Sequence, residues 1–141
     1  MKLEEFKKKY PTFNIDFYIN FNYDLLKVKN ILEHFETIGK DEVRIISFES
    51  FKKYNQQFNY YYFLKKYEHF IKSYLLNNVN QLNICLTYCF FRKLWKNDFF
   101  GLVNLKQYND FITFYKNYYT NLFDYKYYFN KYQDLNQNGL N

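Results

Sequence analysis

The sequence predicts an α+β fold: a ferredoxin-like split βαβ arrangement (strand-helix-strand-strand-helix-strand) with a long protruding hairpin and a C-terminal helical extension. Three observations predict it. Residues 13–21 alternate strictly between apolar and polar side chains, and residues 23–38 repeat apolar side chains every three or four positions. Residues 84–96 then form an apolar stretch of helical length.

The chain is expected to have three parts. Residues 1–12 are charged and contain the only proline, Pro11, so we expect an N-terminal tail that orders only on a partner. Residues 13–106 would form the ferredoxin-like domain. Residues 107–141 carry a long apolar and aromatic seam with helical spacing, which predicts a helix that docks on the domain or on a neighbour. The seam consists of Phe111, Tyr115, Tyr118, Leu122, Tyr125, Phe129 and Tyr132.

The first two elements are predicted by a change of period. The strand at residues 13–21 would direct Phe and Ile to one face and Asn, Asp and Tyr to the other. The helix at residues 23–38 would begin after an N-cap at Asn22 and end at a left-handed C-cap at Gly39. His34 lies beside its apolar stripe, and we interpret it as a partly exposed structural histidine.

The remaining elements complete the sheet. Residues 43–48 are β-branched and apolar, which favours a second strand, and a return strand would run from about residue 60 to 76. A turn rich in Asn would follow. Residues 84–96 would form the second helix, apolar nearly all round and therefore covered on more than one side. Residues 99–106 would form a short last strand around Gly101.

The amino-acid composition is unusual and reflects the base composition of the gene more than the needs of the fold. There are 18 Tyr and 18 Phe, no Ala, 3 Gly, 1 Pro and 2 Arg against 18 Lys. Residues with AT-rich codons are abundant and those with GC-rich codons nearly absent, which suggests a strongly AT-biased genome, such as that of a protist mitochondrion, a plastid, a plasmid or a virus. The net charge of +6 favours an acidic partner, such as nucleic acid or an anionic surface.

Several classes of function are disfavoured. No apolar run approaches the ~20 residues that cross a bilayer, so we expect no membrane among the partners of this chain. The N-terminus lacks an apolar signal region, and Glu4 and Glu5 argue against a transit peptide, so an organellar protein would be made inside its organelle. Cys85 and Cys89 lack a partnering Cys or His pair and are expected to be buried thiols. The chain has no motif for phosphate binding, nucleophilic catalysis or metal binding, so we expect no enzyme, no cofactor and no small-molecule substrate.

The candidate binding site is the stretch from residue 46 to 70. Two lysine pairs flank an aromatic, amide-rich run, and a hairpin would place a pair near each of its feet. Lysines neutralise phosphates, and tyrosines stack on unpaired bases or fill gaps between RNA and protein. A polar surface hairpin with incidental lysines is the plain alternative. The predicted RNA-binding residues are Lys52, Lys53, Tyr54, Tyr60, Tyr61, Tyr62, Lys65 and Lys66.

The order of these elements, together with the central stretch, resembles the small-subunit ribosomal protein S-ten family in its mitochondrially encoded form. The resemblance covers about residues 13–106. Members open with a strand and an amphipathic helix that ends near a glycine, as in FYINFNYDLLKVKNILEHFETIG. They then carry a long hairpin, whose return arm has two lysines followed by Glu, a polar residue and Phe. The residues that match this return arm are Lys65-Lys66-Tyr67-Glu68-His69-Phe70. Mitochondrial members also carry a double Phe, a basic helix end and a Phe-Gly before the last strand, and the matching residues here are Phe90-Phe91, Arg92-Lys93 and Phe100-Gly101.

The resemblance implies a structural, non-catalytic protein of the mitochondrial small ribosomal subunit. Its partners would be ribosomal RNA, gripped by the hairpin with little sequence specificity, and neighbouring small-subunit ribosomal proteins. Two alternatives remain open. One is a small protein-binding immunity or anti-defence module from an AT-rich plasmid or phage, with the tail as a dimer seam. The other is a soluble accessory subunit of an organellar respiratory assembly.

Overall fold

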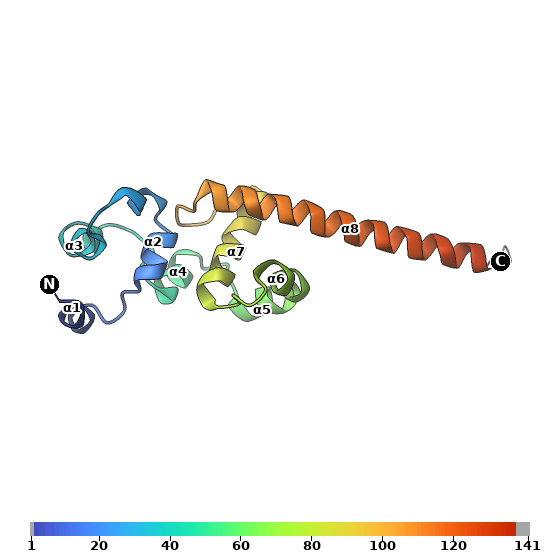
Figure 1. Cartoon of the computed structure of the whole chain (residues 1–141). Coiled ribbons are helices and arrows are strands. Elements are labelled where there is room, and N and C mark those ends of the chain that lie inside the picture. The colour runs from blue at the N-terminus through green and yellow to red at the C-terminus, as the bar shows by residue number, and fades with distance from the viewer. Residues whose placement is uncertain (1, 138–141) are drawn as a thin grey trace. The chain divides into compact units, whose positions relative to one another are not determined.

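The computed structural model describes residues 2–137, and the side chains of residues 2–122. Every regular element in it is helical, as the coiled ribbons of Figure 1 show. The only β pairing among the described residues is one isolated parallel bridge between Asn22 and Leu102. The expected ferredoxin-like α+β fold is therefore wrong. The elements are α1 (Leu3–Lys9), α2 (Ile15–Asn20), η1 (Tyr23–Lys27), α3 (Ile31–Thr37), η2 (Gly39–Asp41), α4 (Phe48–Tyr54), α5 (Tyr60–Lys66), α6 (Glu68–Leu75), α7 (Gln81–Leu94) and α8 (Leu105–Gln137).

The chain forms two compact units, Met1–Tyr108 and Asn109–Asn141. The first unit includes the segment that the sequence suggests is a tail. Residues 3–9 form α1, and Phe6 is buried in a cluster with Tyr18, Leu25 and Phe35. The described part of the second unit, residues 109–137, belongs to α8, where the aromatic spacing predicts a helix. The last three positions of that seam have side chains outside the described residues.

Asparagine starts several of the helices. The side-chain oxygens of four asparagines accept hydrogen bonds from backbone N–H groups in the first turn of α2, α3, α5 and α7, and these N-caps are Asn14, Asn30, Asn59 and Asn80. Helix α4 begins instead with a capping box between Ser47 and Ser50. Each cap satisfies donors that the first turn leaves unpaired. A residue that the codon bias makes abundant thus marks the helix starts of this fold.

The first predicted strand is helix α2. Phe17, Tyr18 and Phe21 are buried, and their spacing of one and four residues is that of a helix face. Ile15, which the alternating pattern assigns to the core, is 42% exposed, whereas Tyr18, assigned to the polar face, is fully buried. Burial of this tyrosine is possible because its hydroxyl is hydrogen-bonded to Nδ1 of His34, at 2.8 Å.

The predicted helix at residues 23–38 is divided into η1 and α3. Asn22 does not cap a helix; its buried amide donates to the backbone oxygens of Tyr18 and Ile45, at 2.7 and 2.8 Å. Asn30 provides the cap eight residues later. Gly39 is not a left-handed C-cap but begins η2, where a Cβ atom would collide with the Tyr18 hydroxyl. His34 is partly buried and bonded to Tyr18, which confirms its structural role.

The predicted hairpin at residues 46–70 is also wrong. These residues form α4, α5 and the start of α6 instead. The segment expected as a return strand, residues 60–76, lies almost wholly in α5 and α6. The Ser47–Ser50 capping box and the Asn59 cap favour helices over an extended path. Within residues 43–48 only the buried Ile45 behaves as a core strand residue would, and no strand partner is present among the described residues.

Helix α7 confirms the second predicted helix and runs through the core. Eight consecutive residues, 84–91, are buried, so the helix is covered on all sides there, as expected from its composition. Both cysteines are free, buried thiols, which confirms the prediction. The core around α7 is aromatic: the rings of Phe51, Phe58 and Phe63 each pack against Tyr88. The last predicted strand, at residues 99–106, is absent except for the bridge at Leu102.

Candidate nucleic-acid interface

The net positive charge of the chain comes from one segment. Residues 1–44 contain eight Lys or Arg and eight Asp or Glu, and residues 109–141 contain three of each, so both regions are neutral. Residues 45–108, here called the basic segment, contain nine Lys or Arg and three Asp or Glu. The whole net charge of +6 therefore lies in the segment that holds α4–α7. Such an asymmetry is typical of a surface for an anionic partner.

Few of these cations are neutralised by the protein. Glu49 pairs with Lys52 at 3.3 Å and Glu68 pairs with Lys72 at 2.7 Å. Among the described residues, the other basic side chains of this segment form no ion pair; they are Lys53, Lys65, Lys66, Arg92, Lys93, Lys96 and Lys106. Their charges are available to an external partner.

The eight predicted RNA-binding residues lie on two helices, α4 and α5, and not on a hairpin. Lys52 and Tyr60 meet at the ring of Phe48: the Lys52 ammonium lies 4.6 Å from its centroid, and the Tyr60 ring packs on it at 5.4 Å. Tyr61, Tyr62, Lys65 and Lys66 are exposed on α5. The remaining two, Lys53 and Tyr54, end α4 and line a cleft.

Lys66 shows how cation and aromatic ring are combined on this surface. Its ammonium lies 5.7 Å from the ring centroid of Tyr62 and 5.4 Å from that of Tyr67. Lys93 has the same relation to Tyr108, at 4.6 Å. A cation beside the face of an aromatic ring offers a nucleotide both of the contacts it needs, one for the phosphate and one for the base.

The cleft that holds Lys53 and Tyr54, here called the α4–α7 cleft, has a volume of about 770 Å³. Three parts of the chain line it. They are residues 53–57, at the end of α4 and just after it, Tyr88 and Arg92 of α7, and residues 97–100, which follow α7. Asn55 holds two of these walls together. Its amide oxygen accepts from the Phe100 N–H at 2.7 Å, and its amide nitrogen donates to the Phe100 carbonyl oxygen at 3.2 Å. The Tyr54 and Phe100 rings also pack, at 4.7 Å between centroids.

Arg92 is the cation that α7 contributes to this cleft. Its guanidinium lies 5.8 Å from the Tyr88 ring centroid, and Nη2 donates to the Gln57 side-chain oxygen at 2.9 Å. Nη2 also reaches the Asp98 carbonyl oxygen, at 3.4 Å. The buried Nε has no hydrogen-bond partner in the described part of the chain. The arginine is thus fixed by its neighbours without being neutralised by any of them.

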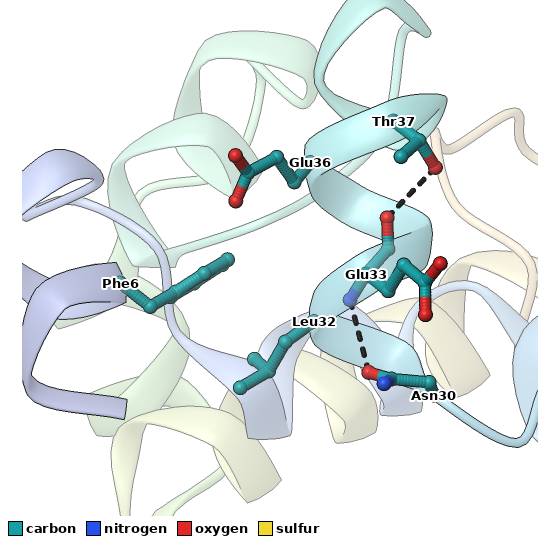
Figure 2. A pocket seen from close by; sticks show the side chains of 6 residues that line it. All are labelled: Phe6, Asn30, Leu32, Glu33, Glu36 and Thr37. Carbon is teal, nitrogen blue, oxygen red and sulfur yellow. Dashed lines mark hydrogen bonds between the residues drawn. The ribbon is translucent and has the colours of Figure 1, made fainter. Parts of the chain in front are cut away.

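A second hollow, of about 580 Å³, belongs to the neutral N-terminal region (Figure 2). Phe6 and Glu36 project into it, and Asn30 caps α3 through the Glu33 N–H beside it. The Glu36 carboxylate is paired with Lys9 at 3.1 Å. With two glutamates among its six lining residues, this hollow is unsuited to an anionic ligand.

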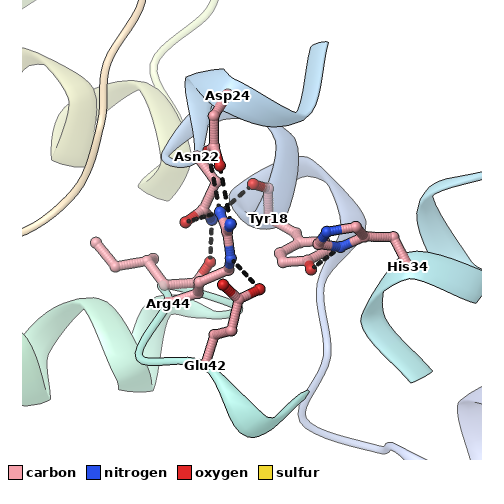
Figure 3. A network of polar contacts seen from close by, with 7 residues as sticks. Tyr18, Asn22, Asp24, His34, Glu42 and Arg44 are labelled. Atoms are coloured by element: carbon pink, nitrogen blue, oxygen red, sulfur yellow. Dashed lines mark hydrogen bonds and ion pairs between the residues drawn. The ribbon is translucent and has the colours of Figure 1, made fainter. Parts of the chain in front are cut away.

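A polar network around Arg44 stabilises the same region (Figure 3). The guanidinium donates two bonds to the Asp24 carboxylate, at 3.0 and 2.8 Å, and one to Glu42, at 3.1 Å. The hydrogen bonds from Arg44 hold the pKa of Asp24 below its ordinary value. Burial raises the pKa of Tyr18, which lies beside this network, to about 12. Arg44 is therefore committed to ion pairs within the protein.

The cysteines and the possible metal ligands of the described residues are the remaining candidates for chemistry. Burial raises the pKa of both thiols, Cys85 and Cys89, so neither is an activated nucleophile. In the described part of the chain, no group of three or more His, Cys, Asp or Glu is placed to hold a metal ion. No helix there combines the length and the apolar character that a membrane span requires.

Sequence reasoning missed most of the cleft. Arg92 and Asn55 could not be assigned to it, because their partners lie 35 and 45 residues away in sequence. The available signal was the position of Arg92 as the only arginine of the basic segment. No protein-family description, curated protein or solved structure matches this chain.

Proposed function

We propose that this chain is a non-catalytic RNA-binding protein that holds phosphate groups through the basic segment. The observation that carries the proposal is the confinement of the entire net charge to residues 45–108, where seven cations have no ion pair among the described residues. Lysine and arginine side chains that neutralise phosphates release counterions, and this release is the main source of affinity in binding without sequence specificity.

The aromatic side chains favour RNA over other anionic partners. Tyr61 and Tyr62 are 80% and 64% exposed, beside Lys65 and Lys66 on the same helix. Exposed tyrosine rings offer flat faces on which unpaired bases can stack.

The assembly we propose is an organellar small ribosomal subunit, in the mitochondrion. The AT-biased residue usage supports an organellar gene, and the basic, aromatic segment suits a protein that packs against folded RNA. The proposal does not use the fold of the S-ten family, because that fold is α+β and this chain is helical. It therefore stands on charge and composition.

The test is a charge reversal with a matched control. Lys65 and Lys66 lie in the last turn of a seven-residue helix, as do Lys7 and Lys8 of α1 in the neutral region. The Lys65→Glu/Lys66→Glu variant should bind a fluorescent 30-nucleotide RNA stem-loop about tenfold or more weakly, about 1.4 kcal/mol. The Lys7→Glu/Lys8→Glu variant has the same net charge and should bind at close to the wild-type level.

Two results would count against the proposal. Equal losses in the two variants would mean that only total charge matters, and not the basic segment. A purified chain that is a well-folded dimer indifferent to RNA would favour a protein-binding immunity or anti-defence module instead. In cells, co-sedimentation of the native protein with small ribosomal subunits tests the assembly separately from RNA binding.

A further inference from the structure

We propose that the α4–α7 cleft is a subsite for one unpaired nucleotide of single-stranded RNA. The inference rests on the proposed RNA-binding function and adds which kind of RNA is bound and where. The exposed lysines of α5 would hold phosphates of any RNA, whereas the cleft would accept a nucleotide only after it has left a base stack.

The size and chemistry of the cleft fit a single nucleotide. Its volume of about 770 Å³ lies within the roughly 300–1,000 Å³ of small-molecule sites. Two cations that line the cleft, Lys53 and Arg92, would bind the phosphate. The rings of Tyr54 and Phe100 would contact the base. Asp98 also lines the cleft. Its carboxylate disfavours a phosphate nearby and can accept a hydrogen bond from a base N–H group.

The walls are fixed before any ligand enters. The pair of Asn55 bonds to Phe100 joins α4 to the segment after α7, and the Tyr54–Phe100 ring contact reinforces the junction. Asn55 itself is only 6% exposed, so water does not compete for its amide. A preformed wall reduces the ordering cost of binding, which is a general source of affinity for small sites.

Arg92 supplies the recognition element. Contacts to Gln57, Tyr88 and the Asp98 carbonyl hold its guanidinium in place, yet no carboxylate pairs with it in the described part of the chain. The hydrogen bonds to Gln57 and to the Asp98 carbonyl are both made by Nη2, and the buried Nε has no hydrogen-bond partner in that part of the chain. A phosphate oxygen or a base carbonyl can accept a charge-assisted hydrogen bond from Nη1, and such bonds are stronger than those between neutral groups.

The geometry favours single strands over duplexes. In an A-form helix the bases are stacked, and the deep, narrow major groove is inaccessible to side chains. Rings that line a cleft, like Tyr54 and Phe100, can be reached only by a base that is splayed out. A duplex would still bind the exposed lysines, but it would leave the cleft empty.

The test compares two RNAs and one pair of variants. The probes are a fluorescein-labelled twelve-nucleotide oligouridine and a twelve-base-pair RNA duplex, titrated with the full chain at fixed salt. Arg92→Gln should weaken oligouridine binding about tenfold and duplex binding by no more than threefold. Lys96→Gln is the control, because it removes one charge from the same end of α7 at a residue that does not line the cleft. It should weaken the two probes to the same small extent.

A further pair of variants keeps the test decisive if Arg92→Gln does not fold. Lys53→Gln changes an exposed cleft side chain, and Tyr54→Leu removes the ring but keeps an apolar residue. Both should selectively weaken oligouridine binding. If the cleft variants behave like Lys96→Gln while Lys65→Glu/Lys66→Glu still loses binding, the cleft inference is wrong and the RNA-binding function stands. If the wild-type chain binds neither probe, both proposals fail.

Discussion

Replacement of Asn55 by alanine is expected to be among the most damaging single changes to the basic segment. The side chain makes three hydrogen bonds: two with the backbone of Phe100 and one to the Phe51 carbonyl oxygen, at 3.1 Å. Each such bond contributes about 1 kcal/mol net, and a buried group left without a partner costs about 1–3 kcal/mol. We expect Asn55→Ala to lower the free energy of unfolding by about 2–4 kcal/mol. That is a large fraction of the ~5–15 kcal/mol of a typical domain.

Urea unfolding followed by circular dichroism at 222 nm measures this loss. The midpoint should fall while the slope with urea stays constant, because the variant changes stability and not the surface exposed on unfolding. Gln56→Ala is the control: its side chain is exposed and forms no hydrogen bond within the described residues, so a change within about 0.5 kcal/mol is expected. If the two variants unfold at the same urea concentration, Asn55 does not join the two walls.

Three further outcomes are expected. Gly39→Ala would place a methyl group against the Tyr18 hydroxyl, which bonds to His34, and should destabilise the chain by about 1–3 kcal/mol in the same urea assay; an unchanged midpoint would mean that this contact relaxes freely. Cys85 and Cys89 are buried with raised pKa values, so at pH 8 a thiol reagent should label them slowly in the native chain and at once in urea; fast native labelling would contradict their burial. The raised pKa of Tyr18, about 12, means that its neutral form is favoured in the folded state. Its contribution to stability is complete below pH 10 and is lost as the pH rises from 10 to 12, so Tyr18→Phe should show a smaller fall over that range; equal falls would refute this role.

The sequence predicts the two longest helices, α7 and α8, but the periodic residues 23–38 form two short helices and not one. The apolar run of α7 and the aromatic seam of α8 are long enough to exclude a strand. The failures lie in short elements of six to eight residues, such as α2, α4 and α6. There the codon bias places Phe, Tyr and Ile on exposed and buried positions alike, so a pattern of alternate apolar residues does not mark a face. Tyrosine illustrates this, because Tyr61 is 80% exposed whereas Tyr18 is fully buried.

The helix caps are a second local signal, although the two caps predicted at Asn22 and Gly39 are wrong. An Asn or Ser followed by a helical segment starts α2, α4, α5 and α7, and their side-chain bonds to first-turn N–H groups are local. The candidate site was only half predictable. Lys53 and Tyr54 could be assigned from the sequence, but the cleft depends on contacts between α4, α7 and residues 97–100, which no local pattern encodes.

The salt dependence of RNA affinity tests the central claim most directly. If the basic segment neutralises phosphates, a plot of log affinity against log salt for the stem-loop should be linear, with a slope of about −0.7 to −0.9 for each phosphate contact. At least three contacts are expected from the seven cations without ion pairs, so the slope should be about −2 or steeper. Lys65→Glu/Lys66→Glu should flatten it, and Lys7→Glu/Lys8→Glu should not. A slope near zero, or the same slope in both variants, would contradict the account.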